Sequence, residues 1–472
     1  MDTLVGDRAV VLGGSIAGLL TARVLADHYT EVVVVERDEL PAGVAHRRGV
    51  PQGRHIHALL ARGQQALEEL FPDITAQLTA RGARTGDVLA DARHCFGGHR
   101  FRRQSSGLVA VCASRPMLES HIRARVRALP AVQILDRCDV AGFTTTPDTT
   151  RVTGARVLRR ADGSAEEVVG ADLVVDATGR GSRTPAWLEA LGYPRPPMEQ
   201  VRIGVGYTTR LYRLAPDALG GDLAVLVGPT PDDPRGGALQ ALEGRRYLLT
   251  LIGVLGGHPP TDPDGFDAFA RSLRFPDIAE AIRGADPLDS PIAFRFPASV
   301  RHRYERLSRV PDGLLVVGDA LCSFNPIYGQ GMSVAALEAL ALRRHLERGA
   351  RPRPSRVLRD LGRLVDLPWG IAAGGDLTFP EVEGRRSVQT RLVNRYITRV
   401  QAAAERDAEV GRAFVRVSGL VDRPESLLRP RLVARVLRGV HEDHRLHARS
   451  ARAIADNSHR HQASVELSRT VE

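Results

Sequence analysis

The chain has 472 residues, 43% of them hydrophobic and 25% charged, which is typical of globular proteins and long enough for two or three domains. The formal net charge of +10 comes from arginine alone, because the sequence contains no lysine, and this excludes any mechanism that needs a lysine, such as a Schiff base or lysine-assisted halogenation. The arginines are scattered beside acidic residues, without the basic runs and interleaved aromatic rings of a nucleic-acid interface, so we expect no nucleic-acid partner.

Cysteine spacing and the apolar segments exclude further classes of protein. Cys95, Cys112, Cys138 and Cys322 stand far apart with no Cys-x-x-Cys pair, which argues against a metal site and against a disulfide framework. No apolar stretch reaches the ~18 residues that a membrane helix needs. The first residues also lack the pattern of a signal peptide. We therefore expect a cytoplasmic protein without a membrane span.

The start of the chain predicts a Rossmann-like unit: a strand at Ala9–Leu12, a helix at Ile16–His28 and a strand at Val32–Val35. The turn GGSIAG follows the Gly-x-Gly-x-x-Gly pattern, with Ser15 in place of the middle glycine. Such a turn holds a pyrophosphate at the helix N-terminus, and an acidic residue after the second strand accepts hydrogen bonds from a ribose. The unit therefore predicts a dinucleotide site, with candidate binding residues Gly13, Gly14, Ser15, Ala17, Gly18, Glu36 and Arg37.

The middle of the chain contains two kinds of strand. The first kind is mixed with helices, and the second alternates apolar with polar residues and is rich in β-branched and aromatic residues, as in antiparallel sheets. The strands of the first kind are expected at Val132–Asp139, Val152–Leu158 and Asp172–Asp176, with strand-like pieces within 81–110. The helices mixed with them are expected at His57–Phe71 and Pro116–Leu129. The second kind comprises Arg202–Tyr212, Tyr247–Val254 and Ile292–Val300.

A buried strand at Leu314–Val317 runs into the sequence GDALCSFNPIYGQGMS and then a helix at Ser333–Arg348. A Pro-rich break at 349–355 follows, and the remainder to Glu472 is expected to be mostly helical. Asp319 stands directly after the strand, and the tight loop before the helix contains Pro326, Gly329, Gly331 and Met332.

This segment resembles the second flavin motif of the class A flavoprotein monooxygenases, the para-hydroxybenzoate hydroxylase-like family. The resemblance implies that Asp319 binds the ribityl chain of FAD and that Pro326, Gly329, Gly331 and Met332 lie by the pyrimidine edge of the isoalloxazine ring. The physics fits, because reduced flavin carries negative charge at that edge, and N–H donors and a helix N-terminus stabilise it.

Three further segments resemble the same family. DLVVDATGRGSRTP resembles its middle motif, with Thr178 where the family often has an acid. Arg115 resembles an arginine that reaches the FAD phosphates, and Val140 lies in a segment similar to one that contacts adenine. Residues 47–72 resemble actinobacterial natural-product monooxygenases, including epoxidases of polyether polyene precursors. In that segment His55 and His57 are candidates either for acid–base groups or for packing near FAD.

The resemblance implies an α/β fold in which a Rossmann-like FAD-binding domain is interrupted by an antiparallel-sheet substrate domain and followed by a C-terminal helical region. The antiparallel sheet would roof the substrate cavity, with Tyr207, Arg210 and Tyr247 as candidate substrate residues, although strand alternation turns half of such residues away. The expected divisions are a discontinuous FAD-binding domain at 1–80, 108–196 and 285–348, a substrate-binding domain at 81–107 and 197–284, and a helical region at 349–472.

The implied activity is an FAD-dependent monooxygenase, in which NAD(P)H reduces the flavin and a C4a-hydroperoxyflavin transfers one oxygen atom of O2 by epoxidation or hydroxylation. A small hydrophobic polyene, terpenoid or phenolic natural-product intermediate is the expected substrate. No catalytic side chain is assigned, because the cofactor carries the chemistry. NAD(P)H binds transiently or acts through a separate flavin reductase. The alternatives are a flavin halogenase, a flavin-linked reductase of isoprenoid double bonds, or a basic nucleic-acid-binding or regulatory protein that merely retains a flavin.

Overall fold

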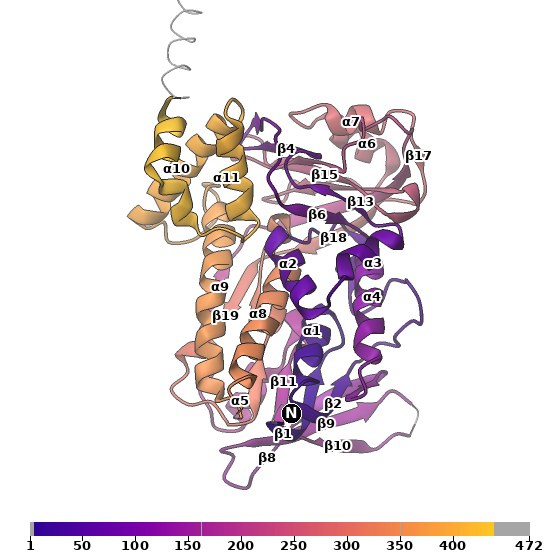
Figure 1. Cartoon of the computed structure of the whole chain (residues 1–472), viewed down its shortest axis with the longest axis vertical. Helices are drawn as coiled ribbons and strands as arrows, with labels where there is room; N and C mark the ends of the chain where they lie inside the picture. Colours follow the sequence, from indigo (N-terminus) through magenta and orange to yellow (C-terminus); the bar gives the residue numbers. More distant parts are fainter. Residues whose placement is uncertain (1–3, 162, 350, 439–472) are drawn as a thin grey trace, which may run out of the picture.

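Five parallel strands form the base of the molecule in the computed structural model, which describes residues 4–161, 163–349 and 351–438 (Figure 1). Their apolar runs are buried, because helices and a three-stranded antiparallel sheet pack against these strands. Every neighbouring pair is parallel, so the carboxyl ends of all five meet at one edge. The strand order is β20 (Leu314–Val316), β11 (Leu173–Asp176), β1 (Gly6–Leu12), β2 (Tyr29–Val35) and β7 (Val132–Leu135).

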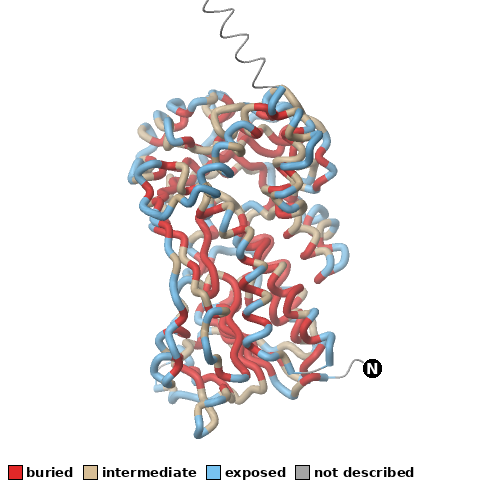
Figure 2. Tube along the Cα trace, turned by 90° about the vertical axis from the view of Figure 1, so that its left-hand side faces the viewer, coloured by how far each residue is buried: buried red, intermediate tan, exposed pale blue. Residues whose placement is uncertain are grey.

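Helices cover this sheet, and the largest buried apolar cluster lies between the two layers (Figure 2). Helix α1 (Ile16–Leu25) packs between α4 (Arg115–Arg127) and α8 (Gly331–Leu346), and α9 (Pro354–Asp376) packs against α8. A three-stranded antiparallel sheet lies at the same end of the molecule. The remaining elements of this part are helices α2 (Ala61–Leu70), α3 (Ile74–Ala80) and α5 (Thr184–Ala190) and strands β8 (Cys138–Thr145), β9 (Val152–Arg159) and β10 (Glu166–Gly170).

A mainly antiparallel sheet of eight strands forms the other end of the molecule (Figure 1). Helices α6 (Pro263–Arg271) and α7 (Asp277–Ala281) cover one face of it through a second apolar cluster. The pair β14–β4 is parallel, and the other pairs are antiparallel. The strands are β17 (Asp286–Pro287), β13 (Val205–Arg213), β16 (Tyr247–Gly253), β15 (Arg235–Ala241), β14 (Ala224–Val227), β4 (Ala92–Phe96) and β5 (His99–Arg100), with β18 (Ile292–Phe296) also paired to β13.

The remaining elements are two C-terminal helices and two small sheets. The C-terminal helices α10 (Val388–Ala404) and α11 (Ala408–Ser418) pack on residues such as Leu89 and Phe101 of the upper sheet region. None of the described helices is long and apolar enough to cross a bilayer. The small sheets are β12 (Met198–Val201), β19 (Ser299–His302) and β21 (Cys322–Ser323), and the pair β3 (Arg84–Asp87) and β6 (Val109–Cys112).

The structure confirms the predicted α/β class with its parallel and antiparallel sheets and C-terminal helices, but it corrects several element boundaries. The strand expected at Val132–Asp139 ends at Leu135 and a new strand begins at Cys138, because Arg137 adopts φ +54° between them. The strand expected at Ile292–Val300 breaks at Pro297, which has no N–H for the ladder. The predicted helical remainder is present as α9, α10 and α11, and residues 439–472 lie outside the described part.

The close packing of Gly18 against Gly13 in the GGSIAG turn can be tested by substitution. A Cβ at Gly18 would overlap the Gly13 carbonyl oxygen, whereas nothing lies within 4 Å of a Cβ built at Gly181, which follows β11. We expect Gly18→Ala to lower the free energy of unfolding by about 2 kcal/mol through overpacking. Gly181→Ala should leave it within about 0.5 kcal/mol. Thermal unfolding of both variants checks this, and equal melting temperatures would contradict it.

Candidate functional site

Two loops that are far apart in the sequence meet at the carboxyl edge of the parallel sheet. The GGSIAG loop follows β1, and Gly318–Asp319 follow β20, two strands away. Gly318 has φ +63°, and a Cβ built there would lie only 2.7 Å from the Cβ of Ala17. The sequence predicted that these two segments belong to one site, and the fold brings them into contact.

The first loop presents free N–H groups at its helix. Gly13 adopts φ +106°, and a Cβ there would lie 2.5 Å from the Ala177 carbonyl oxygen, so glycine is required. The Gly14 N–H donates to Glu36 Oε2 at 2.8 Å. Helix α1 has no side-chain cap and no acidic residue in its first turn. The first-turn amides of α1 are therefore available to an anion.

Ser15 takes part in a contact that no glycine could make. Its hydroxyl donates to Glu119 Oε2 at 2.8 Å and accepts from Arg115 Nη2 at 2.9 Å. Glu119, on α4, also pairs with Arg115 at 3.1 Å, with Arg47 at 2.6 Å and with Arg123 at 3.6 Å. The serine thus connects the dinucleotide turn to a buried group of one carboxylate and three guanidiniums.

Burial alone would raise the pKa of Glu119, but Arg115 and Arg47 outweigh burial and hold the pKa of this carboxyl below its usual value. Glu119 is therefore ionised at neutral pH. Its charge fixes Arg115 beside Ser15, on the side of the loop where the α1 amides are free.

Glu36 is buried and held from several directions. Its Oε1 accepts from the Asp38 N–H at 2.9 Å, and its Oε2 pairs with Arg47 at 3.2 Å. The Glu36 carbonyl accepts from the Cys138 N–H at 2.9 Å, which brings the strand that contains Val140 to this edge. The candidate residues for the adenosine half are thus neighbours. Arg37 is exposed at the end of β2.

The second loop contains a carboxylate without a hydrogen bond from the described part of the chain. Asp319 is half-buried, and burial raises its pKa against the opposing effect of Arg180 and Arg115. Behind it the Gly318 N–H donates to Glu338 Oε2 at 2.6 Å, and burial raises the pKa of Glu338 to about 8. Asp319 therefore remains available to a donor such as a hydroxyl group.

The loop before α8 holds a buried amide that the sequence analysis missed. After the 3-10 turn Pro326–Tyr328, Gly329 adopts φ +64° and Gln330 precedes α8, whose first residues are Gly331 and Met332. Gln330 is 1% exposed, yet neither Oε1 nor Nε2 has a partner among the described residues. The signal was its place between two glycines at a helix start.

The antiparallel sheet presents one face to this region. His55 packs on Phe294 at 5.3 Å between ring centroids, and its Nδ1 lies 2.7 Å from Thr209 Oγ1. Thr209 in turn bonds to Thr250, whose hydroxyl accepts from the Ile56 N–H at 3.1 Å. Tyr207 shares this face, since the alternate residues of β13 point the same way.

The two candidate histidines are neutral at physiological pH. Burial, with Arg54, lowers the pKa of His55 to about 4, and burial, with Arg115, lowers that of His57 to about 3. His57 Nδ1 donates to the His55 carbonyl at 3.0 Å, so one of its nitrogens is committed to the backbone. Neither ring supplies a positive charge to the site.

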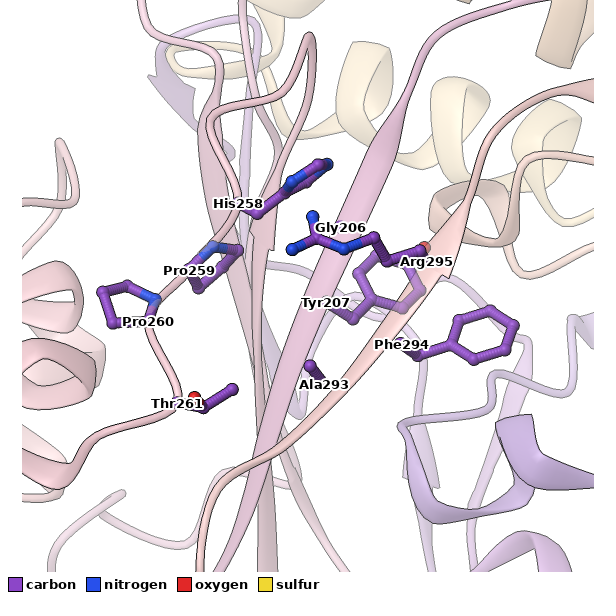
Figure 3. Close-up of a pocket in the computed structure, with 9 residues that line it drawn as sticks. All are labelled: Gly206, Tyr207, His258, Pro259, Pro260, Thr261, Ala293, Phe294 and Arg295. Atoms are coloured by element: carbon purple, nitrogen blue, oxygen red, sulfur yellow. The ribbon is translucent and has the colours of Figure 1, made fainter.

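The other two candidate substrate residues lie on the opposite face of the sheet. Arg210 donates to the Asp289 carbonyl, and Tyr247 belongs to the cluster under α6 and α7. This face also has a cavity of about 250 Å3, in which His258 and Arg295 lie close together while the Phe294 ring points the other way (Figure 3). The structure therefore separates Tyr207 from Arg210 and Tyr247.

The model of the FAD binding domain family matches residues 8–356. The chain belongs to this FAD-binding family. Protein Rv3254 from Mycobacterium tuberculosis is 37% identical over 441 residues, covering 88% of this chain and 90% of that protein. The FAD-binding chain is therefore a flavoprotein oxidoreductase.

Solved structures share the fold of the FAD-binding chain. The flavin-dependent brominase Bmp2 matches with a TM-score of 0.63 and 14% identity over 93% of this chain and 99% of its own. The p-nitrophenol 4-monooxygenase PnpA from Pseudomonas putida matches with a TM-score of 0.61 and 18% identity over 90% of this chain and 100% of its own.

The described residues fit FAD. The α1 N-terminus and Arg115 offer donors to a pyrophosphate, Asp319 offers a free acceptor to the ribityl hydroxyls, and the unpaired amide of Gln330 matches a ring edge that both donates and accepts. An orphaned buried amide is costly unless a ligand pairs with it.

Asp319→Ala should weaken FAD binding about tenfold or more, because one charge-assisted hydrogen-bond acceptor is lost. The exposed Asp232→Ala provides a matched control that should bind FAD as the wild type does. Titration of the apo-protein with FAD, followed by flavin fluorescence, measures both dissociation constants. An unchanged constant for Asp319→Ala would count against its role.

Glu119→Ala should lower the free energy of unfolding by about 3 kcal/mol, because it leaves the buried guanidiniums of Arg115 and Arg123 without their carboxylate partner. Glu69 pairs with Arg62 and Arg343 at the surface, so Glu69→Ala should cost less than about 1 kcal/mol. Denaturant unfolding of the two variants tests this contrast, and similar losses would refute it.

Proposed function

We propose that this flavoprotein is a monooxygenase that transfers one O2-derived oxygen atom to an electron-rich double bond or aromatic ring of a polyketide, terpenoid or aromatic natural-product intermediate. The observation that carries the proposal is that the Ala17 and Gly318 loops meet, while Ile327 of the loop before α8 packs on the Tyr207 face of the antiparallel sheet. An elongated cofactor held by both loops would place its reactive end under that face.

In this proposal the chain's residues position and shield the cofactor. Arg115 and the α1 N-terminus hold the pyrophosphate, Asp319 holds the ribityl chain, and Gln330 with the α8 N-terminus holds the ring. FAD supplies the redox chemistry, with NAD(P)H as reductant, acting directly or through a separate flavin reductase, and O2 as co-substrate.

The sheet face opposite the ring would exclude water and select the substrate. Tyr207, Phe294 and the neutral His55 give it aromatic surface, with the buried hydroxyls of Thr209 and Thr250 as polar groups. A dry, aromatic face suits a small hydrophobic substrate, and it protects the activated oxygen from loss to water.

Halogenation is the principal alternative, because a brominase shares the fold. The absence of lysine from the sequence argues against lysine-assisted halogenation. A flavin-linked reductase would use the same cofactor site but would not consume O2. The proposal covers epoxidation and hydroxylation alike.

Isotope labelling tests the proposal. The purified protein with FAD, NADPH and a polyene or phenolic substrate should consume O2, and 18O from 18O2 should enter the product. The matched reaction in H2 18O with unlabelled O2 should give no label in the stable product. Label that comes only from water, or turnover without O2, would exclude the monooxygenase.

A further inference from the structure

The last residue of α9 reaches the loop that precedes α8. Asp376 is 0% exposed, and its Oδ1 accepts from Asn325 Nδ2 at 2.8 Å and from the Tyr328 hydroxyl at 3.1 Å. A Cβ at Gly375 would overlap the Tyr328 hydroxyl, so glycine is needed for this approach. The C-terminal helical region thus contacts the candidate flavin-ring loop directly.

Asp376 holds both ends of one short turn. Asn325 begins the 3-10 turn that Tyr328 completes, and its Oδ1 accepts from the Ile327 N–H at 3.2 Å. Because Asp376 takes the Asn325 amide NH2, it fixes which side of that amide faces the turn. The turn leads through Gly329 to Gln330 and the N-terminus of α8. A movement of Asp376 would therefore move the groups proposed to hold the ring.

The second oxygen of this carboxyl group is not satisfied. Asp376 Oδ2 is buried and has no partner among the described residues. The titratable groups that face Asp376 are Tyr328, from the loop, and Tyr207, from β13. Burial raises the pKa of Asp376 to about 7, against the opposing hydrogen bonds from Asn325 and Tyr328. The group therefore gains or loses its proton near neutral pH.

We propose that Asp376 is a positioning residue for the flavin ring, which fixes the loop from Asn325 to Gly331 and makes FAD affinity depend on pH. The proposal rests on the proposed placement of the ring beside this loop. It assigns a role in the cofactor site to a helix that continues beyond the matched family segment.

The sign of the pH dependence follows from linkage. Bound FAD brings negative charge and removes further water from the site, and both effects favour the neutral form of Asp376. The pKa of Asp376 is then higher in the complex than in the free protein. FAD affinity is therefore highest below the free-protein pKa of about 7 and falls as the pH rises through it.

Two substitutions of Asp376 separate the effect of its hydrogen bonds on FAD binding from the effect of its protonation. Asp376→Asn keeps an acceptor for Asn325 and Tyr328 but cannot titrate, whereas Asp376→Ala removes the acceptor. Asp376→Ala should weaken FAD binding about tenfold at about pH 6, where Asp376→Asn should bind within about threefold of the wild type. Between about pH 6 and pH 8.5, the wild type should lose about tenfold more affinity than Asp376→Asn, since any contribution of Glu338 is common to both proteins.

Two matched controls are Asp360→Asn, which changes another aspartate of α9, and Tyr193→Phe, which changes another hydrogen-bonded tyrosine. Asp360→Asn changes a carboxylate of α9 that pairs with His345, and it should keep the wild-type pH dependence. Tyr328→Phe should weaken FAD binding about threefold, whereas Tyr193→Phe, which loses a bond to the Thr149 carbonyl, should not. Apo-protein is titrated with FAD and followed by flavin fluorescence.

A wild-type pH dependence in Asp376→Asn would overturn the proposal, as would full affinity in Asp376→Ala. If Asp376→Ala does not fold, Asp376→Asn and Tyr328→Phe decide the question. Unchanged FAD affinity in Asp319→Ala would instead refute the proposed placement of the cofactor. Weakened binding in Asp319→Ala, with wild-type behaviour in the Asp376 and Tyr328 variants, would refute this inference alone.

Discussion

The close approach of Gly318 to Ala17 is the constraint on which the site depends. A side chain at Gly318 would push the loop after β20 away from the loop after β1, and Asp319 would move with it. The parallel sheet makes this approach possible, because it brings the carboxyl ends of β1, β11 and β20 to one edge. One backbone contact thereby relates residues that the sequence separates by most of the chain.

Charge compensation explains how the dinucleotide turn tolerates a serine. The hydroxyl of Ser15 is held between Glu119 and Arg115, so its added volume is accommodated by α4. Buried ion pairs contribute little net stability, but they fix geometry when every member is paired. Here the pairing of Glu119 with Arg47 fixes the orientation of Arg115 at the candidate pyrophosphate site.

Sequence analysis predicted the fold class and the meeting of the two loops. The first loop was recognised by its glycine turn after a buried strand, and the second by its resemblance to a flavin motif. Sequence analysis could not predict Glu119 or Asp376, since their significance lies in tertiary partners. It missed Gln330, although the place of this residue between two glycines at a helix start was an available signal. It named both Tyr207 and Tyr247 as candidate substrate residues, whereas the pairing of β13 with β16 turns their side chains to opposite faces of the sheet. The roles assigned to the individual cofactor residues, and the domain boundaries, stay predictions.

Helix α9 has a consequence for how the chain can be divided. The family segment ends at residue 356, near the start of this helix, while the carboxylate that holds the loop lies at its other end. A chain cut after residue 356 would retain every glycine of both motifs. It would nevertheless leave the amide of Asn325 and the hydroxyl of Tyr328 without their shared acceptor. On the role proposed for Asp376, we expect the smallest functional unit of this protein to be longer than the family segment by at least one helix.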